Sequence, residues 1–281
     1  MKYYHVDVFS SEILSGNGLT VVFPDKELSN QRLLGIAQEF KQFETIFVYP
    51  QSNDGYPIKI FTVEEELDFA GHPIIGAGAV IHKYFYPNLR NVGIIFKIAN
   101  RKISVKSEML NNSFKVIMNQ GKPQFLMTVS HNNYCDIASA LNVGVSDLHK
   151  MYPIEVVSTG LPYLLVPLEN NLDKAKIIIP DFESFLSQFG AKFIYVFNPE
   201  TLECRTWDNA GIVEDIATGS AAGPLYAYLV KNGFRKPGEI INISQGRFVN
   251  RPSIIQGWIT DEKEVVLNGE VTFFGLGELL I

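Results

Sequence analysis

Two long runs of small and apolar residues, Glu65–Ile81 and Val213–Val230, dominate the hydrophobic pattern of this chain. Each run begins with acidic residues, passes through a glycine-containing turn, and then carries apolar side chains at almost every position. A helix that is apolar nearly all round belongs in the interior of a domain. The pattern therefore predicts two buried helices, one over residues 73–85 and one that follows Gly219.

Strand-like segments precede and follow the first run. Tyr3–Phe9 alternates between apolar and polar residues, and Leu19–Phe23 is its predicted partner strand. Gly16-Asn17-Gly18 lies between them and predicts a hairpin turn, because Asn-Gly favours positive φ. Ser29 is placed to cap a helix that ends near Phe40. Further strands are predicted at 45–49, 58–63, 93–98, 103–106 and 114–118.

The second half of the chain repeats this order of elements, although the side chains mostly differ. Its predicted elements are strands at 152–157, 163–166, 192–197 and 202–207, a helix at 181–189, and closing strands at 240–244, 253–259, 265–267, 271–274 and 279–281. The two glycines at the turns, Gly71 and Gly219, lie about half a chain length apart. The repeat predicts an internal duplication.

The expected fold class is α+β. We expect two pseudo-symmetric domains, each a curved, mostly antiparallel sheet wrapped around its central apolar helix. The first domain is expected to span residues 1–120 and to be completed by the C-terminal strand 271–281, and the second to span 121–270. Two such domains would place both glycine-rich helix starts at a shared cleft, where ligands commonly bind.

The composition and charge of the chain limit the partners and the location that we expect for it. The 281 residues include 24 basic and 30 acidic side chains, a formal net charge of −6, without a run of Lys or Arg, so no nucleic-acid partner is expected. No apolar run approaches the ~20 residues that span a bilayer, and the N-terminus has no signal-peptide core, so we expect no membrane partner and a cytoplasmic location. Cys135 and Cys204 are expected to be reduced, mostly buried thiols.

Three side chains are candidates for chemistry: Glu44, His72 and Asp215. Aromatic residues surround Glu44 in the sequence, and a desolvated carboxyl group there would suit a general acid or base. Each residue also has a purely structural interpretation, since Glu44 could be a solvated surface residue, His72 a turn residue and Asp215 a helix cap. No metal site is expected, because His72 has no ligand partner at a suitable spacing, and zinc-protease, P-loop and serine-hydrolase motifs are absent.

The N-termini of the two apolar helices are suited to binding an anion. Gly71, Gly219 and Ser220 would supply backbone N–H groups at the positive end of the helix dipole. A small anionic metabolite is therefore the expected ligand.

Several motifs together resemble those of the phenazine-biosynthesis-like isomerases, the PhzF family of the diaminopimelate epimerase-like fold. The resemblance implies two similar domains with the active site between them, no cofactor, and a homodimer. It also implies that Glu44 transfers the proton, that His72 and Asp215 orient the substrate, and that the remaining site residues bind it: Asn17, Gly71, Gly219 and Ser220. The motifs are Phe69–Pro73, Glu214–Ala221, Gly16-Asn17, Glu44-Thr45, Gln245-Gly246 and Arg251-Pro252-Ser253.

The chain departs from the family pattern at Gly18, Ile216 and Asn250, and Pro224 is unexpected because it removes a helical N–H. Epimerases and racemases of this fold use two cysteines at positions that are here Ala70 and Thr218. A two-thiol mechanism is therefore not expected.

The resulting hypothesis is a cofactor-independent isomerase that moves a proton within a small, carboxylate-bearing metabolite, with Glu44 as both base and acid. The alternative is a non-catalytic small-anion binder or interaction protein that retains the fold. A cysteine-dependent racemase is a third hypothesis, which the positions of Cys135 and Cys204 disfavour.

Overall fold

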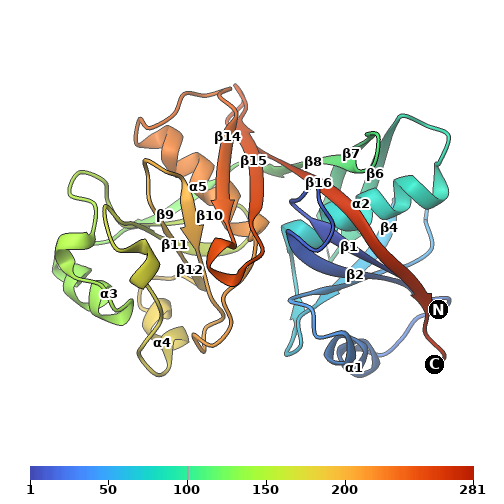
Figure 1. Cartoon of the computed structure of the whole chain (residues 1–281), viewed down its shortest axis with the longest axis horizontal. Coiled ribbons are helices and arrows are strands. Elements are labelled where there is room, and N and C mark those ends of the chain that lie inside the picture. Colours follow the sequence, from blue (N-terminus) through green and yellow to red (C-terminus); the bar gives the residue numbers. More distant parts are fainter. Residues whose placement is uncertain (100) are drawn as a thin grey trace. The chain divides into compact units, whose positions relative to one another are not determined.

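The structure, a computed structural model, describes residues 1–99 and 101–281. The chain divides into two compact units (Figure 1). Unit 1 comprises Met1–Asn119 and Leu267–Ile281, and unit 2 comprises Gln120–Val266.

Unit 1 is a sheet that closes on itself. Its strands are β1 (Lys2–Val8), β2 (Asn17–Phe23), β3 (Thr45–Val48), β4 (Tyr56–Phe61), β5 (Glu66–Leu67), β6 (Asn91–Ile98), β7 (Arg101–Met109), β8 (Phe114–Gly121) and β16 (Val265–Glu278). The hydrogen-bonded order is β1-β2-β3-β4-β6-β7-β8-β16, and β16 also pairs with β1, which closes the barrel. β2–β3 and β4–β6 are parallel, whereas β1–β2, β3–β4 and β6–β7–β8 are antiparallel.

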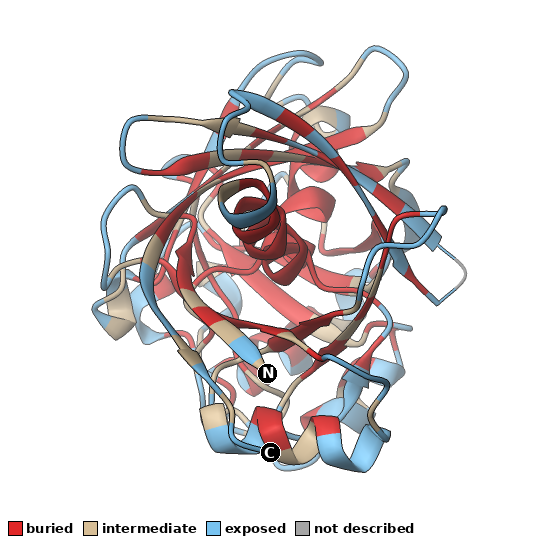
Figure 2. Ribbon diagram, turned by 90° about the vertical axis from the view of Figure 1, so that its right-hand side faces the viewer, coloured by how far each residue is buried: buried red, intermediate tan, exposed pale blue. Residues whose placement is uncertain are grey.

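The helix α2 (Gly71–Phe85) lies inside this ring of strands, and every residue from Gly71 to His82 is buried (Figure 2). Gly76 and Gly78 make the close packing possible. A β-carbon at Gly76 would lie 2.4 Å from Leu19 Cδ2, and one at Gly78 would lie 3.2 Å from Val105 and Val116. The prediction of a buried apolar helix is confirmed.

The helix α1 (Asn30–Phe40) covers part of the outer face of the same sheet. Its buried residues Leu33, Ile36 and Ala37 form a cluster with Val22 and with the aromatic rings of β3 and β4. The predicted cap is confirmed, because the Ser29 side chain accepts a hydrogen bond from the backbone N–H of Arg32. α1 thus leads the chain directly into Glu44 and β3.

Unit 2 repeats the topology of unit 1. Its elements are β9 (Gln124–Thr128), α3 (Tyr134–Ala140), β10 (Glu155–Ser158), β11 (Pro162–Pro167), α4 (Phe182–Ser187), β12 (Phe193–Phe197), β13 (Glu203–Arg205), α5 (Gly219–Lys231), β14 (Ile241–Gln245) and β15 (Ser253–Ile259). The pairs β10–β11, β11–β12, β12–β13, β13–β14 and β14–β15 alternate between antiparallel and parallel, as do the corresponding pairs of unit 1. α5 takes the place of α2, and it is buried from Gly219 to Leu229. The predicted α+β class, with each sheet around a central apolar helix, is confirmed.

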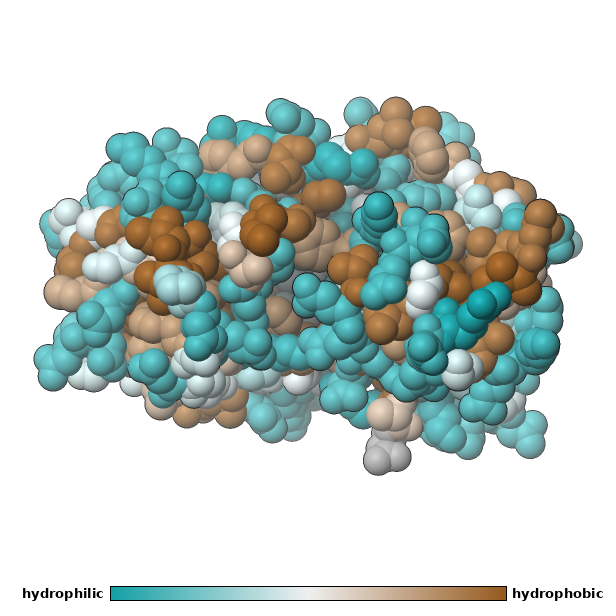
Figure 3. All heavy atoms as spheres, turned by 90° about the horizontal axis from the view of Figure 1, so that it is seen from below, coloured by the Kyte–Doolittle hydropathy of each residue, from teal (hydrophilic) through white to brown (hydrophobic). Residues whose placement is uncertain are grey.

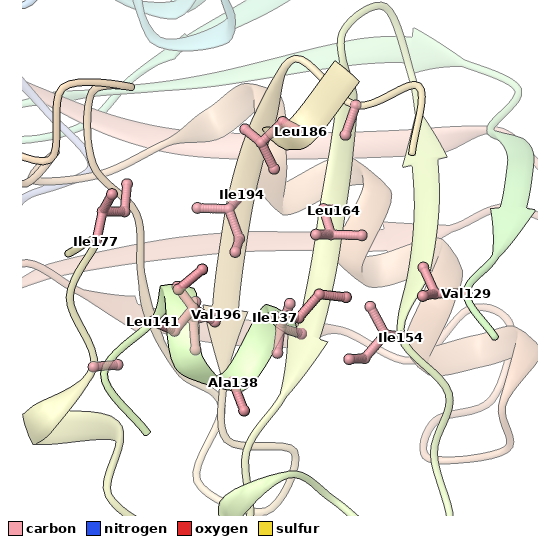
Figure 4. Close-up of a cluster of buried hydrophobic side chains, with 14 of the residues drawn as sticks. Val129, Ile137, Ala138, Leu141, Ile154, Leu164, Ile177, Leu186, Ile194 and Val196 are labelled. Atoms are coloured by element: carbon pink, nitrogen blue, oxygen red, sulfur yellow. The ribbon is translucent and has the colours of Figure 1, made fainter. Parts of the chain in front are cut away.

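A second apolar layer covers the sheet face of unit 2 that points away from α5. Leu164 and Val166 of β11 and Ile194 and Val196 of β12 pack against Ile137 and its neighbours in α3 (Figure 4). Because side chains alternate along a strand, Tyr163, which precedes Leu164, and Tyr195, which lies between Ile194 and Val196, point to the α5 side. Tyr163 therefore reaches Ser220 at the start of α5, and Tyr195 reaches Gln245.

Three sequence predictions of local structure were wrong. Asn17 and Gly18 belong to β2, opposite Val8 and Asp7, and the connection is the longer segment 9–16, in which Phe9, Leu14 and Gly16 adopt positive φ. The separate closing strands predicted at 265–267 and 271–274 are one continuous strand, β16, and residues 279–281 lie outside it. β9 and α3 were not predicted.

Pro224 neither delays nor ends α5, which runs without interruption from Gly219 to Lys231.

In the described residues, no helix combines the length and apolar character needed to cross a membrane. The face in Figure 3 is largely hydrophilic, with apolar side chains in separate groups. Three consecutive exposed apolar residues, Phe125, Leu126 and Met127, belong to β9.

Candidate functional site

The N-terminus of α2 is the first part of the candidate site. Ala70 is the N-cap residue in an extended conformation, and its methyl side chain cannot cap the helix. Gly71 and His72 form the first turn, and both are buried. Because the first N–H groups of a helix have no partner within it, this end of α2 is a set of oriented donors at the positive end of the helix dipole.

Glu44 lies next to His72. The Glu44 Oε2 atom is 3.3 Å from His72 Nε2, and the exposed fractions of the two side chains are 14% and 4%. Burial lowers the pKa of His72 to about 3, and the adjacent helix dipole acts in the same direction. The imidazole is therefore neutral near pH 7, so this contact joins a carboxyl group to a neutral ring and is not an ion pair.

Asn17 lies at the same end of unit 1. β2 and β3 are parallel with Thr20 opposite Thr45, so Asn17 and Glu44 both lie near the beginnings of their strands. Leu19 contacts Gly76, and Phe23 contacts Phe85 at the far end of α2, so β2 begins beside the N-terminal end of the helix. Asn17 itself is only 1% exposed. Unit 1 thus gathers Asn17, Glu44, Gly71 and His72 at one end of its barrel.

Unit 2 gathers the remaining predicted residues at the start of α5. Thr218 is the N-cap residue, and Gly219 and Ser220 form the first turn. The Thr218 hydroxyl donates a hydrogen bond to Asp215 Oδ2 instead of capping the helix. The simple interpretation of Asp215 as a helix cap is therefore wrong, because Thr218 is the N-cap residue and the helix begins at Gly219, four residues after Asp215.

Two side chains that sequence reasoning missed hold the first turn of α5. The Tyr163 hydroxyl is 2.7 Å from the Ser220 hydroxyl, and Gln120 Nε2 donates to the Gly219 carbonyl oxygen at 3.0 Å. Both contacts join residues more than fifty positions apart in the chain. No local pattern could have indicated them.

The segment before Asp215 is anchored by a buried ion pair. Arg205 Nε and Nη2 donate to the two carboxylate oxygens of Glu214 at 2.9 and 2.6 Å. Arg205 Nη1 also donates to three backbone carbonyl oxygens, and the guanidinium stacks against Trp207 and Phe248. A bidentate, fully hydrogen-bonded pair of this kind has a single geometry, so it defines the path of the chain into Asp215.

The cysteines do not lie at either helix start. Cys204 is buried in β13, and burial raises the pKa of its thiol well above the usual range. Cys135 is exposed on α3, so the expectation of two mostly buried thiols was wrong for this residue. Within residues 1–99 and 101–281, no group of three or more His, Cys, Asp or Glu side chains is arranged to hold a metal ion.

Comparison with known proteins identifies the family. A family model described as phenazine biosynthesis-like protein, PhzC-PhzF, matches residues 6–275. The chain belongs to this family.

Similar proteins support the same assignment. The chain is 30% identical to the trans-2,3-dihydro-3-hydroxyanthranilate isomerase of Pseudomonas chlororaphis over 99% of both chains. It is also 30% identical to the uncharacterized isomerase YddE of Escherichia coli (strain K12), over 92% of this chain and 90% of that protein. A solved structure titled as a predicted epimerase from Pseudomonas aeruginosa covers 100% of this chain and 99% of its own, with a TM-score of 0.95 and 37% identity. The expected family, isomerase class and epimerase-like fold are confirmed.

Proposed function

We propose that this protein is a cofactor-independent isomerase that removes a proton from one carbon of a small carboxylate-bearing metabolite and returns it to another position. Glu44 is the proton-transferring residue in this proposal. The observation that carries the proposal is the contact between the Glu44 carboxyl group and the buried, neutral His72 beside the N-terminus of α2.

The neutral imidazole suits a carboxyl group that must gain and lose a proton in each cycle. A permanently cationic neighbour would favour only the ionised form of Glu44. A neutral His72 instead leaves both forms accessible, because its Nε2–H tautomer can donate to the carboxylate and its Nδ1–H tautomer presents Nε2 as an acceptor to the carboxylic acid. Glu44 would take the substrate proton as a base and deliver it as an acid, so that no net proton is consumed.

The substrate becomes more negative when its proton leaves. N–H groups at helix N-termini stabilise such developing charge because they are oriented before the reaction begins. We propose that Gly71 in unit 1 and Gly219 and Ser220 in unit 2 supply these donors, and that Asn17, His72 and Asp215 bind and orient the same substrate.

Proton transfer to and from solvent tests the function. Because a relative at 30% identity is named for it, trans-2,3-dihydro-3-hydroxyanthranilate is the first compound to incubate with the protein in heavy water. Proton return should label one carbon of the product with deuterium, detected by NMR or mass spectrometry. Saturable binding without deuterium incorporation, here and across a panel of unsaturated carboxylates, would support the non-catalytic binder instead.

Replacing Glu44 tests its role. Glu44→Gln should lower turnover by about 10²–10⁴-fold, the usual contribution of a general acid–base residue, and should leave the fold intact. Glu39→Gln is the matched control, because Glu39 is an exposed glutamate of α1 five residues earlier in the chain. Full turnover by Glu44→Gln would sink the proposed mechanism.

A further inference from the structure

The buried side chain of Gln245 joins the start of α5 to the sheet of unit 2. Its exposed fraction is 1%, and it is the last residue of β14. Its Oε1 atom accepts hydrogen bonds from the Tyr195 hydroxyl at 2.8 Å and from the Thr218 backbone N–H at 3.2 Å. Its Nε2 atom donates to the Asp215 carbonyl oxygen and to Thr218 Oγ1, both at 2.9 Å.

These partners determine the direction of every bond. A backbone N–H only donates and a carbonyl oxygen only accepts, so the Gln245 amide has one allowed orientation. Its NH₂ group must therefore donate to Thr218 Oγ1. The one hydrogen of the Thr218 hydroxyl then remains for Asp215 Oδ2, the contact that the structure shows.

The hydrogen bonds from Gln245 to Thr218 and from Thr218 to Asp215 form a relay between buried side chains. Asp215 is 8% exposed and Thr218 is 7% exposed. A buried carboxylate is stable only where donors replace the water that it has lost. The relay from Gln245 through Thr218 supplies such a donor in a fixed position, and it engages Oδ2 as an acceptor.

We propose that Gln245 and Thr218 are positioning residues that hold Asp215 in one orientation as a hydrogen-bond acceptor for the substrate. This inference rests on the proposed function, in which Asp215 binds the substrate. It adds a chemical requirement: the substrate presents a donor, an amine, ammonium or hydroxyl group, to Asp215.

A matched pair of variants separates positioning from a structural role. Thr218→Val has nearly the same shape without the hydroxyl group, and Thr218→Ser retains the hydroxyl group. Crystal structures of both should show an unchanged α5, with Asp215 in one orientation in Thr218→Ser and turned or split between rotamers in Thr218→Val. An unchanged Asp215 in Thr218→Val overturns the proposal. A shift of α5 together with Asp215 also overturns it, because Thr218 would then be a structural residue.

Neutron diffraction of the wild-type protein tests the relay even if Thr218→Val does not fold. The Thr218 hydroxyl hydrogen should point at Asp215 Oδ2, and Oδ2 should carry no hydrogen of its own. A hydrogen that points elsewhere, or a protonated Oδ2, refutes the relay. Neither structural experiment uses turnover, so each can fail while the deuterium test succeeds, or the reverse.

Two simple probes test the requirement for a donor. Benzoate has only the carboxylate, and 2-aminobenzoate adds an amine next to it. Calorimetry should show at least about fivefold tighter binding of 2-aminobenzoate by the wild-type protein and by Thr218→Ser, and a lost preference in Thr218→Val. Equal affinities for the wild-type protein, or no measurable binding of either probe, overturn the donor requirement.

Discussion

At the scale of single residues, the distinctive feature is a titratable ring that does not titrate near neutral pH. His72 is buried in the first turn of α2, and its desolvation lowers its pKa to about 3. Glu44 is 3.3 Å away and less buried than the ring. The pair combines a buried, neutral imidazole with a carboxyl group whose side chain is partly exposed.

The pKa of His72 predicts how stability depends on pH. The pKa is lower in the folded state than the ordinary value of 6.5, so between these values the unfolded state binds more protons. The contribution of neutral His72 to the free energy of unfolding is complete above about pH 6.5 and is lost as pH falls toward 3. At about pH 5 the loss from this group is about 2 kcal/mol.

Urea unfolding of the wild-type protein and His72→Gln at about pH 7.5 and about pH 5 isolates this contribution. The wild-type protein should lose about 2 kcal/mol more stability than the variant on acidification, because carboxyl groups elsewhere titrate in both. Equal losses in the two proteins would show that folding does not lower the pKa of His72.

At the scale of elements, the central helices owe their position to small side chains. α2 is surrounded by strands on all sides. A β-carbon at Gly76 would meet Leu19 Cδ2 at 2.4 Å, and one at Gly78 would be in tight contact with Val105 and Val116 at 3.2 Å. Glycine costs a helix about 1 kcal/mol relative to alanine, so its presence in a buried helix is explained by this close contact.

Two glycine-to-alanine substitutions should therefore have opposite effects. In Gly76→Ala the new methyl group would meet Leu19 Cδ2 at 2.4 Å in a fully buried site, and we expect a loss of about 1–3 kcal/mol. Gly35 lies in α1 with no atom within 4 Å of the new methyl position, so Gly35→Ala should gain about 0.5–1 kcal/mol from helix propensity. Urea denaturation measures both, and a stabilised Gly76→Ala protein would refute the packing argument.

At the scale of the whole molecule, the chain is a duplicated topology in which the C-terminus completes the first unit. β16 pairs with β1 from Val271 to Glu278, and the Leu279 backbone exchanges hydrogen bonds with Met1. In unit 2, β9 pairs with β10. The corresponding pair in unit 1 is the C-terminal part of β16 with β1. The last strand is thus part of the first barrel.

Truncation tests this closure. Deletion of residues 271–281 should expose the edge of β1 and open the barrel around α2, with loss of cooperative unfolding and increased binding of a hydrophobic dye. Deletion of Leu280 and Ile281, which are 94% and 60% exposed, should change the free energy of unfolding by no more than about 0.5 kcal/mol. Cooperative unfolding of the longer truncation would show that β16 is dispensable.

Local signals explain which predictions succeeded. Ser29 marked the start of α1, and nearly continuous apolar composition marked α2 and α5. The Asn-Gly signal failed because the segment 9–16 takes its positive φ at Phe9, Leu14 and Gly16, which leaves Asn17 in a strand. β9 was missed because its five residues are all exposed and follow no alternating pattern.

The sequence alone determined the two buried helices, the repeated order of elements, and the residue types at each helix start, because these depend on neighbouring positions. The tertiary structure decided the contact between Glu44 and His72, the neutral state of that ring, and the relay from Gln245 through Thr218 to Asp215. Burial and long-range hydrogen bonds depend on the path of the whole chain, since Thr218 and Gln245 are 27 residues apart and Gln245 and Tyr195 are 50 apart. The sequence therefore indicates the groups at the candidate site, and their orientation and state of protonation follow from the fold.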